Sequence, residues 1–270
     1  MPELPEVETI KCELSPSVAG KTIENVELLS ERIVKRPSHE EFLKGVIGRR
    51  IESLSRRGKY LIFCLDSGNF LIMHLKISGS LFVSKNREDM PKYTKAVIAL
   101  NDGGYIFFRD PRSFGRMWLD KDTSEVEKML GPEPFTQEFT LEELEKRLAR
   151  RHIPIKAVLL DQAVIAGIGN MYADEVLYAS KIHPLRLASS LSRREIKKLH
   201  DNILRILSLA ILSKGASVQN YFRPSGEKGK AHFNFKVAHG LGGKDCPCGG
   251  EIIRIVVRGR GTYFCPKCQK

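Results

Sequence analysis

Residues 1–8, MPELPEVE, put a proline directly after the initiator methionine and three glutamates among eight positions. Proline is accepted in the first turn of a helix, where its missing N–H has no partner to lose, and carboxylates suit the positive end of the helix dipole. Val7, Ile10 and Leu14 follow at helical spacing and would form an apolar face. The segment therefore predicts a helix that packs against a core at the start of the chain.

The same residues have a second, chemical interpretation. Removal of Met1, which a small second residue such as Pro2 permits, would leave a secondary amine as the N-terminus. That amine would stand beside the carboxylates of Glu3 and Glu6. The segment by itself does not choose between a structural and a catalytic role for Pro2.

The composition points to a polyanionic partner. The chain has 270 residues and a formal net charge of +12, and residues 221–270 hold ten Lys or Arg against three Asp or Glu. This excess suits nucleic acid or an acidic membrane surface, although a solvated basic face would look the same. No segment reaches the roughly 20 apolar residues of a membrane span, and the acidic N-terminus is unlike a secretory signal. We therefore expect a cytoplasmic protein.

The pattern along the chain changes from strand to helix. Short apolar runs separated by Gly, Asn, Asp and Ser predict an antiparallel sandwich or barrel, with strands at 60–66, 70–75, 96–100 and 104–110. The two prolines of GPEPFT suggest a linker. The expected domains are a β domain at 1–130, a linker at 131–136, a helical domain at 137–220, and a loop with a cysteine-rich hairpin at 221–270.

Helix signals fill the second part of the chain. Capping boxes are expected where a Ser or Thr precedes a Glu by three residues, at Thr140 with Glu143 and at Ser192 with Glu195. A further pair of helices is expected at 155–166 and 171–182, on either side of the turn GIGN. Two glycines and a helix N-terminus make this turn a good clamp for a phosphate, with Asn170 as a side-chain donor. A plain helix–helix turn is the alternative.

Four of the six cysteines lie within the last 25 residues. They form the pairs CPC and CPKC around an apolar stretch that reads as a hairpin, at Cys246, Cys248, Cys265 and Cys268. Four thiolates on two knuckles are the ligands of a structural zinc ribbon, which we favour over free thiols or a disulfide. The first knuckle is unusual because a single residue, proline, separates its cysteines.

Basic and aromatic residues alternate in one predicted loop. In RDPRSFGR, Arg112 and Phe114 stand two positions apart on a turn that ends in glycine. An aromatic ring can slip between base steps of DNA while a guanidinium takes the place of a removed base. Solvated loop residues are the alternative.

Together these motifs resemble the formamidopyrimidine-DNA glycosylase family. PELPEVET, RGKYL, HL..SGS, DPRSFGR, AGIGNMYADEVL and RGTYFCPKCQ occur in the order and spacing of that family, from residue 2 to the C-terminus. The resemblance implies a multi-domain α+β fold. Its parts are an N-terminal β-sandwich with an N-terminal helix, a helix-two-turn-helix domain and a C-terminal zinc-ribbon hairpin.

The resemblance also implies a chemistry. A monomeric enzyme would excise oxidised purines, 8-oxoguanine and formamidopyrimidines, from double-stranded DNA and nick the abasic site by β,δ-elimination, with one structural Zn²⁺ and no other cofactor. Pro2 resembles the nucleophile, Glu3 the acid and base, and Glu6 a supporting residue. Lys59 matches a lysine for phosphate contact and proton transfer, and Arg260 a residue tied to the second elimination.

Other positions match residues that contact DNA. Those placed on phosphates, on the orphaned base or elsewhere on the DNA surface are His74, Tyr93, Arg112, Phe114, Arg151, Lys156 and Asn170. The loop expected to cover the damaged base runs from Ser217 to Lys228.

The chain departs from the family pattern in places. Ile77 stands where a methionine usually fills the void left by the flipped nucleotide, and a branched side chain is shorter and stiffer. Tyr93 replaces a common histidine, and residues 237–243 read VAHGLGG in place of a strand with a tyrosine. The first cysteine knuckle is one residue short.

Two rival functions remain at this stage. An endonuclease VIII-like enzyme for oxidised pyrimidines would share Pro2 and Glu3 but usually has glycine in place of Leu4 and lacks the long covering loop. A non-catalytic DNA-binding module would use the basic charge, the turn and the zinc ribbon equally well, but would not need Pro2, Glu3 or Lys59.

Overall fold

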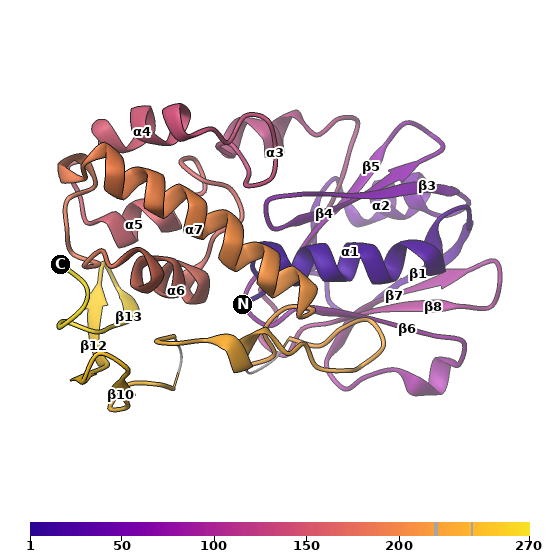
Figure 1. Cartoon of the computed structure of the whole chain (residues 1–270). Coiled ribbons are helices and arrows are strands. Elements are labelled where there is room, and N and C mark those ends of the chain that lie inside the picture. The colour runs from indigo at the N-terminus through magenta and orange to yellow at the C-terminus, as the bar shows by residue number, and fades with distance from the viewer. Residues whose placement is uncertain (219–220, 239) are drawn as a thin grey trace. The chain divides into compact units, whose positions relative to one another are not determined.

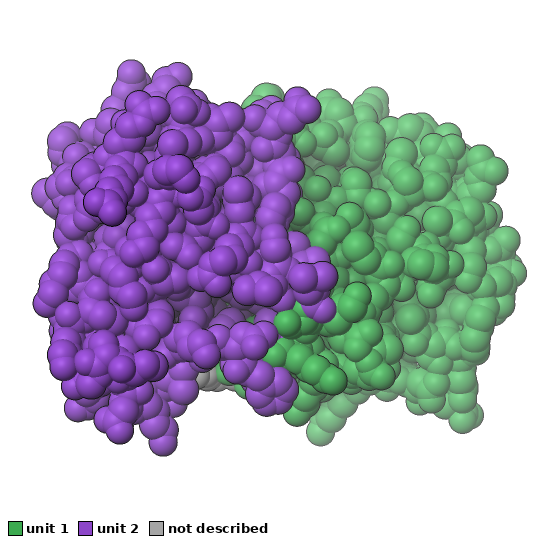
Figure 2. Space-filling view, in the orientation of Figure 1, with its two compact units in different colours: residues 1–128, 213–230 green, residues 129–212, 231–270 purple. Residues whose placement is uncertain are grey.

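The computed structural model describes residues 1–218, 221–238 and 240–270. The chain forms two compact units (Figure 2). Unit 1 contains residues 1–128 and 213–230, and unit 2 contains residues 129–212 and 231–270. The chain therefore leaves unit 1, builds most of unit 2, and returns to unit 1 for a short segment. This division differs from the expected one, in which residues 221–270 form one block after the helical domain.

Unit 1 is a sandwich of two sheets. The four-stranded sheet has the order β1-β7-β8-β6, formed by Ile23–Leu28, Thr94–Leu100, Tyr105–Arg109 and Ser80–Ser84. The five-stranded sheet has the order β2-β9-β5-β4-β3, formed by Val34–Arg36, Arg116–Asp120, Phe70–His74, Tyr60–Leu65 and Ile51–Arg57. The β2–β9 pair is parallel and the other pairs are antiparallel. The four strands expected from the apolar runs are confirmed as β4, β5, β7 and β8.

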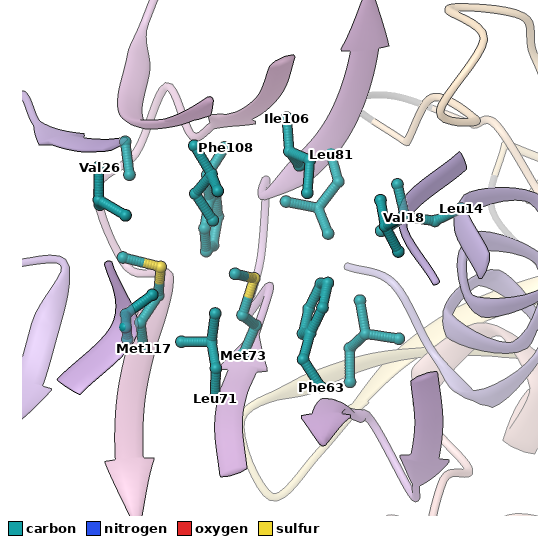
Figure 3. Close-up of a cluster of buried hydrophobic side chains, with 14 of the residues drawn as sticks. Leu14, Val18, Val26, Phe63, Leu71, Met73, Leu81, Ile106, Phe108 and Met117 are labelled. Carbon is teal, nitrogen blue, oxygen red and sulfur yellow. The ribbon is translucent and has the colours of Figure 1, made fainter. Parts of the chain in front are cut away.

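The core of unit 1 lies between its two sheets (Figure 3). Side chains of β1, β6 and β8 face those of β4, β5 and β9, and α1 closes one end with Leu14 and Val18. Phe63, Phe108 and Met73 are each at most 1% exposed. The interior is filled by side chains that alternate along strands, as a period of two requires.

Helix α1, Leu4–Val18, is the helix predicted from the opening segment. Val7, Ile10 and Leu14 are at most 1% exposed, which confirms the expected apolar face. Two shorter helices complete the first part of unit 1, α2 at His39–Val46 and α3 at Ser124–Met129, together with the 3₁₀ turn η1 at Arg87–Asp89.

Segment 213–230 packs against the β-sandwich. The backbone N–H of Val83 donates to the carbonyl of Pro224 at 3.1 Å, and Arg223 forms an ion pair with Glu13 at 2.7 Å. Tyr221 is 4% exposed and belongs to the core of unit 1. These long-range contacts place the described residues of the expected covering loop in unit 1.

Unit 2 is built around helices (Figure 1). They are α4 at Leu141–Ala149, α5 at Ile155–Leu160, α6 at Asn170–Ser180 and α7 at Arg193–Leu212, with 3₁₀ turns η2 at Ala188–Ser190 and η3 at Ala231–Asn234. Both capping interactions occur, because the side chains of Thr140 and Ser192 accept the N–H groups of Glu143 and Glu195. Helix α5 is shorter than the expected 155–166. It ends at Leu160 because Asp161 is already extended and its side chain accepts the N–H of Ala163.

The chain ends in a small ribbon. It contains the pair β10–β11, Asp245–Cys246 and Gly250–Glu251, and the hairpin β12–β13, Ile253–Val257 and Arg260–Phe264. The observed helices, sandwich and ribbon confirm the expected α+β class. Within the described residues, the helices are too short or too polar to cross a membrane.

Candidate functional site

The start of α1 is a buried polar site in unit 1. Met1 is 46% exposed, whereas Pro2 is buried and Glu3 and Glu6 are at most 1% exposed. One carboxylate oxygen of Glu6 accepts the backbone N–H of Glu3 at 2.7 Å. The other accepts the N–H of Ala216 at 2.8 Å. Glu6 thus fixes the segment that carries Pro2 and ties it to the chain that returns from unit 2.

The residues around Glu6 leave no spare room. Gly215 has φ +74°, and a Cβ there would lie 2.9 Å from Cγ of Glu6, so glycine is required for both backbone and space. The Tyr221 hydroxyl lies 3.3 Å from the carbonyl of Lys214. Burial, helped by the negative charge of Glu6, raises the pKa of Tyr221, which therefore stays a neutral donor. The sequence offered no local signal for this contact.

Lys59 sits in the tight turn between β3 and β4. Gly58 has φ 57°, as the first residue of a two-residue type II′ hairpin turn requires, and Lys59 is 6% exposed. Arg56 donates to the carbonyl of Gly58 at 2.9 Å and to Glu8 of α1 at 2.7 Å. Burial alone would raise the pKa of Glu8, but hydrogen bonds and charges from Lys11 and Arg56 lower it to about 2. The turn that holds Lys59 is therefore anchored to α1.

His74, at the end of β5, is a neutral imidazole. It is 8% exposed, and it lies opposite Tyr60 in the β4–β5 register with the two rings at 4.7 Å. Burial, with the nearby charges of Lys76 and Lys59, lowers its pKa to about 3. Its Nδ1 accepts the backbone N–H of Lys76 at 2.9 Å, so the ring proton sits on Nε2. His74 can donate a hydrogen bond to a phosphate without contributing a positive charge.

The loop that carries Arg112 and Phe114 is organised by Asp110. This residue is fully buried, and its carboxylate accepts the N–H of Arg112 at 3.2 Å and that of Gly115 at 2.6 Å. The Ser78 hydroxyl also donates to it. The guanidinium of Arg112 lies 5.5 Å from the ring centre of Phe114, which is 45% exposed. The Asp-Pro step of the loop was the signal for Asp110, because Asp favours such turns.

Phe114 borders a shallow hollow of about 450 Å³ in unit 1. Three basic residues, two aromatic residues and one isoleucine line it: Lys35, Lys76, Arg116, Phe114, Trp118 and Ile77. Ile77 and Phe114, the two candidate wedge residues, therefore line the same hollow. Tyr93 is 49% exposed with φ 70°, and Arg109 lies 6.0 Å from its ring centre.

The expected covering loop is partly closed on itself. The Ser217 hydroxyl donates to the carbonyl of Tyr221 and accepts the N–H of Gly229, both at 2.8 Å. Lys228 is exposed. Residues 219–220, near the start of this loop, lie outside the described residues.

In unit 2 the GIGN turn is held by Gln162. Its side-chain oxygen accepts the N–H of Gly167 at 2.9 Å, and its amide nitrogen donates to the carbonyl of Ile168 at 2.8 Å. Asn170 begins α6 and donates from Nδ2 to the carbonyl of Gly261 at 2.9 Å. An amide nitrogen has two N–H groups, and this contact with the hairpin uses one of them.

Lys156, expected on DNA, is fully buried. Its ammonium donates to the carbonyl of Asn170 at 2.9 Å and forms an ion pair with Asp174. Burial raises the pKa of Asp174 to about 6, although Lys156 acts in the opposite direction. The second oxygen of Asp174 accepts the N–H of Tyr263 at 3.2 Å. The ammonium of Lys156 is thus inside unit 2, bonded to the first turn of α6, and it is not accessible to a DNA phosphate in this structure.

Arg260 follows the tip of the ribbon hairpin. Arg258 and Gly259 form the turn with φ values of 46° and 76°, as a type I′ turn requires, and Arg260 begins β13. Arg151 and Arg260 line one hollow of about 330 Å³, together with Arg258. Asp161 lines the same hollow, 3.7 Å from the guanidinium of Arg151. Three guanidinium groups against one carboxylate leave the hollow with a net positive charge, which suits an anion.

The four cysteines converge on one point of unit 2. Their sulfur atoms all lie within 4.8 Å of one another, with 3.3 Å for Cys246–Cys248, 3.5 Å for Cys248–Cys265 and 3.8 Å for Cys246–Cys268. A tetrahedral zinc with Zn–S bonds of about 2.3 Å needs sulfurs about 3.8 Å apart, whereas a disulfide needs about 2.05 Å. The donor set and its spacing fit a zinc ion.

Glu175 is a buried residue that sequence reasoning missed. It is 5% exposed, and its carboxylate accepts the N–H groups of Lys236, Val237 and Ala238, each at 2.8 Å from Oε1. Burial raises its pKa despite these bonds. Glu175 organises the segment that leads into the ribbon.

Comparisons with known proteins agree with this arrangement. A family model for the formamidopyrimidine-DNA glycosylase N-terminal domain matches residues 1–117, and one for the H2TH domain of the same glycosylase matches residues 130–221. A model for a zinc finger found in FPG and IleRS matches residues 246–270. A glycosylase N-terminal domain, an H2TH domain and a zinc finger define a DNA glycosylase.

Relatives cover the chain from end to end. A formamidopyrimidine-DNA glycosylase of Roseiflexus sp. (strain RS-1) is 44% identical over 276 residues, and one of Bacillus licheniformis is 40% identical over 278 residues, each covering 100% of both chains. The chain belongs to the formamidopyrimidine-DNA glycosylase family.

Solved structures give the same result. A Lactococcus lactis Fpg bound to DNA with an abasic site matches with a TM-score of 0.92 and 36% identity over 99% of each chain. The MutM (Fpg) protein of Thermus thermophilus matches with a TM-score of 0.90 and 36% identity, over 99% of this chain and 98% of that one.

Proposed function

We propose that this DNA glycosylase excises 8-oxoguanine and formamidopyrimidines from duplex DNA and then cleaves the abasic strand through a Schiff base on Pro2. The observation that supports it most is the start of α1, where Pro2 and Glu3 are buried and the N–H of Glu3 is held by Glu6. A module that only binds DNA would need none of Pro2, Glu3 and Lys59.

The first step needs the Pro2 amine. With Met1 removed, the Pro2 nitrogen bonds to C1′ of the flipped nucleotide while the C1′–base bond breaks. The base leaves with a proton from Glu3. Once Met1 is removed, the positive end of the α1 dipole would favour the neutral, nucleophilic form of the Pro2 amine, because it disfavours a further positive charge there.

The second step cleaves the strand. The C1′–O4′ bond then breaks, and the proton lost by the Pro2 nitrogen is taken up by O4′. The resulting iminium nitrogen carries positive charge without a proton, because proline is a secondary amine. The iminium accepts the electron pair when C2′ loses its proton, and the 3′-phosphate leaves. A second elimination releases the 5′-phosphate. We assign proton transfer and phosphate contact to Lys59, and support of the second elimination to Arg260.

The proposed contacts with DNA phosphates combine charged and neutral hydrogen-bond donors. We assign phosphate contacts to Lys59, His74, Asn170 and Arg260, with Arg151 beside Arg260 at the same hollow. Arg112 and Phe114 would fill the space of the flipped nucleotide and read its partner cytosine. Tyr93 would offer a hydroxyl in place of an imidazole. Lys156 would act indirectly, by holding the first turn of α6.

A single structural zinc completes the proposal. Cys246, Cys248, Cys265 and Cys268 would hold it, and the ion would crosslink the two ends of the ribbon. It would take no part in the reaction. The protein would act as a monomer on duplex DNA.

One experiment tests the function. The protein is incubated with a duplex containing 8-oxoguanine opposite cytosine, with borohydride to reduce the iminium, and a thymine glycol duplex serves as the matched control. We expect a covalent adduct and a cleaved strand on the purine lesion. Preference for thymine glycol would favour the endonuclease VIII-like alternative, and tight binding with neither adduct nor cleavage would favour a non-catalytic module.

A further inference from the structure

One face of α6 contacts the ribbon at regular intervals. Asn170 donates to the carbonyl of Gly261, and Asp174 accepts the N–H of Tyr263. Tyr178, four residues after Asp174, and Lys181, three residues after Tyr178, contact the cysteines. The Tyr178 hydroxyl lies 3.3 Å from the sulfur of Cys246, and the Lys181 ammonium lies 3.6 Å from the sulfur of Cys268. The same helix face therefore holds both the hairpin backbone and the cysteine cluster.

The short first knuckle explains why such contacts matter. Pro247 has no N–H, so the one residue between Cys246 and Cys248 offers no donor to either sulfur. The donors within the knuckle are the backbone N–H of Cys248, which donates to the sulfur of Cys246, and that of Gly250, which donates to the sulfur of Cys248. Four thiolates around Zn²⁺ leave a net charge of −2, and hydrogen bonds from outside the ligands disperse such charge.

We propose that Tyr178 and Lys181 are outer hydrogen-bond donors to the zinc-bound thiolates, and that the short knuckle depends on them to retain its metal. This inference rests on the zinc site proposed above. A metal-bound thiolate has no proton, so the Tyr178 hydroxyl must be the donor to Cys246. Each cysteine pair thus receives one donor from α6, and Lys181 adds a positive charge beside Cys268.

The two donors also hold one another in place. Lys181 ends α6 in the left-handed conformation, with φ 62°, and its ammonium lies 4.2 Å from the ring centre of Tyr178. Its carbonyl accepts the N–H of Lys270 at 3.1 Å, and Gln269 donates to the carbonyl of Ile182 at 2.9 Å. The end of the chain, which carries Cys268, is therefore fixed to the end of α6. Metal retention and the position of the ribbon on α6 would be coupled.

The test uses variants of the full-length zinc-loaded protein. Tyr178→Phe keeps the ring but removes the hydroxyl, and Lys181→Met keeps the length but removes the charge. Lys181→Arg restores the charge and a donor. The matched control is Lys267→Met, because Lys267 is next to Cys268 in sequence but its ammonium donates to the carbonyl of Gly249 at 3.4 Å.

Zinc transfer to the chelator 4-(2-pyridylazo)resorcinol measures retention. We expect Tyr178→Phe and Lys181→Met to lower zinc affinity about tenfold each, within the range of about 10- to 100-fold typical of such outer partners. Lys181→Arg and Lys267→Met should stay close to wild type. In the Co²⁺-substituted protein, the sulfur-to-cobalt charge-transfer band should move to longer wavelength in Tyr178→Phe and Lys181→Met, because a thiolate without its donor loses an electron more easily.

The outcomes separate the inference from the zinc site itself. Zinc in the wild type, with equal retention and an unchanged cobalt spectrum in both variants, would overturn the role of Tyr178 and Lys181 while leaving the zinc site intact. A wild-type protein without zinc would overturn both. Far-UV circular dichroism of each variant shows whether α6 is still folded, and the cobalt spectrum reports the thiolates even if overall stability falls.

Discussion

The start of α1 and the cysteine ribbon are two polar sites that the protein stabilises in opposite ways. The carboxylate of Glu6 is fully buried at the edge of a large core made by two sheets and a helix. The ribbon has a small core in which Cys246 and Cys265 are themselves members, with Val237, Ile252 and Tyr178. A large core can hold a buried carboxylate once its hydrogen bonds are made, whereas a small ribbon needs a metal to fold.

Replacement of Pro2 tests the first site most strongly. Pro2→Gly should largely abolish the borohydride-trapped adduct, because the secondary amine is lost. Binding to a duplex with an abasic-site analogue should stay within a few-fold, since the proposed phosphate contacts lie on other residues. Gel analysis of the adduct and a binding titration measure the two effects. Full lyase activity in this variant, or in protein that retains Met1, would contradict the assignment of the nucleophile.

Glu3→Gln should separate the two chemical steps. Base excision should fall by about 10²–10⁴-fold, the usual contribution of a positioned acid or base. Cleavage of a pre-formed abasic site should fall less, because no base has to leave. Single-turnover rates on 8-oxoguanine and abasic duplexes measure this, with the exposed Glu24→Gln as control. Equal losses on the two substrates would show that Glu3 contributes as much to cleavage of the abasic site as to base excision.

Zinc removal tests the second site and leaves the first as an internal control. Chelation, or Cys248→Ser, should unfold the ribbon, displace Arg260 and weaken DNA binding by about tenfold or more, because metal binding supplies much of the folding energy of such a small element. The single tryptophan, Trp118, lies in β9 of unit 1, so its fluorescence reports that unit alone. Its thermal transition should stay unchanged. A lower transition temperature of the Trp118 signal after zinc removal would show that unit 1 also depends on the metal, contrary to the comparison above.

Salt dependence distinguishes charged from neutral phosphate contacts. Each neutralised phosphate contributes a slope of about −0.9 in log K against log salt concentration. Lys59→Ala and Arg260→Ala should therefore each flatten the slope by roughly one. His74→Ala should weaken binding without flattening the slope, because the pKa of His74 is about 3 and its ring is neutral at pH 7. A slope that responds to His74 and not to Arg260 would reverse these assignments.

The smallest expected effect concerns acid stability of unit 1. The pKa of Glu8 is about 2 in the folded protein, below its ordinary value of 4.5. Its stabilising contribution is therefore complete above pH 4.5 and is lost as the pH falls toward 2. The stability difference between wild type and Glu8→Gln should shrink over this range. Urea unfolding followed by Trp118 fluorescence measures it, and a difference independent of pH would show that the ion pair with Arg56 contributes little.

Local patterns predicted much of this protein. The apolar face of α1, the strands β4, β5, β7 and β8, and the caps of α4 and α7 follow from periodicity and from side chains that bond to nearby backbone. The cysteine cluster was equally readable, because zinc ligands have a restricted chemistry and spacing. Family membership followed from the order of the motifs, and the comparisons confirm it.

Contacts between residues far apart in the sequence could not be predicted from local patterns. Lys156 in a helical pattern looks exposed, yet it is fully buried because Asp174, 18 residues later, supplies a partner for its charge. Helix α5 ends six residues early because Asp161 bonds to the backbone of the next turn. Both outcomes depend on a specific partner and not on periodicity.

The sequence by itself determined the groups to which we assign the chemistry: an amine at Pro2, carboxylates at Glu3 and Glu6, and four thiolates. Motifs, helix caps and hydrophobic repeats involve residues only a few positions apart, so each can be recognised in a short segment. Only the tertiary structure decided that Glu6 accepts the N–H of Ala216 from a segment 210 residues away, and that α6 reaches the ribbon sulfurs. Such contacts form after the chain has folded back on itself, when burial makes every unpaired polar group costly and selects the partner that satisfies it.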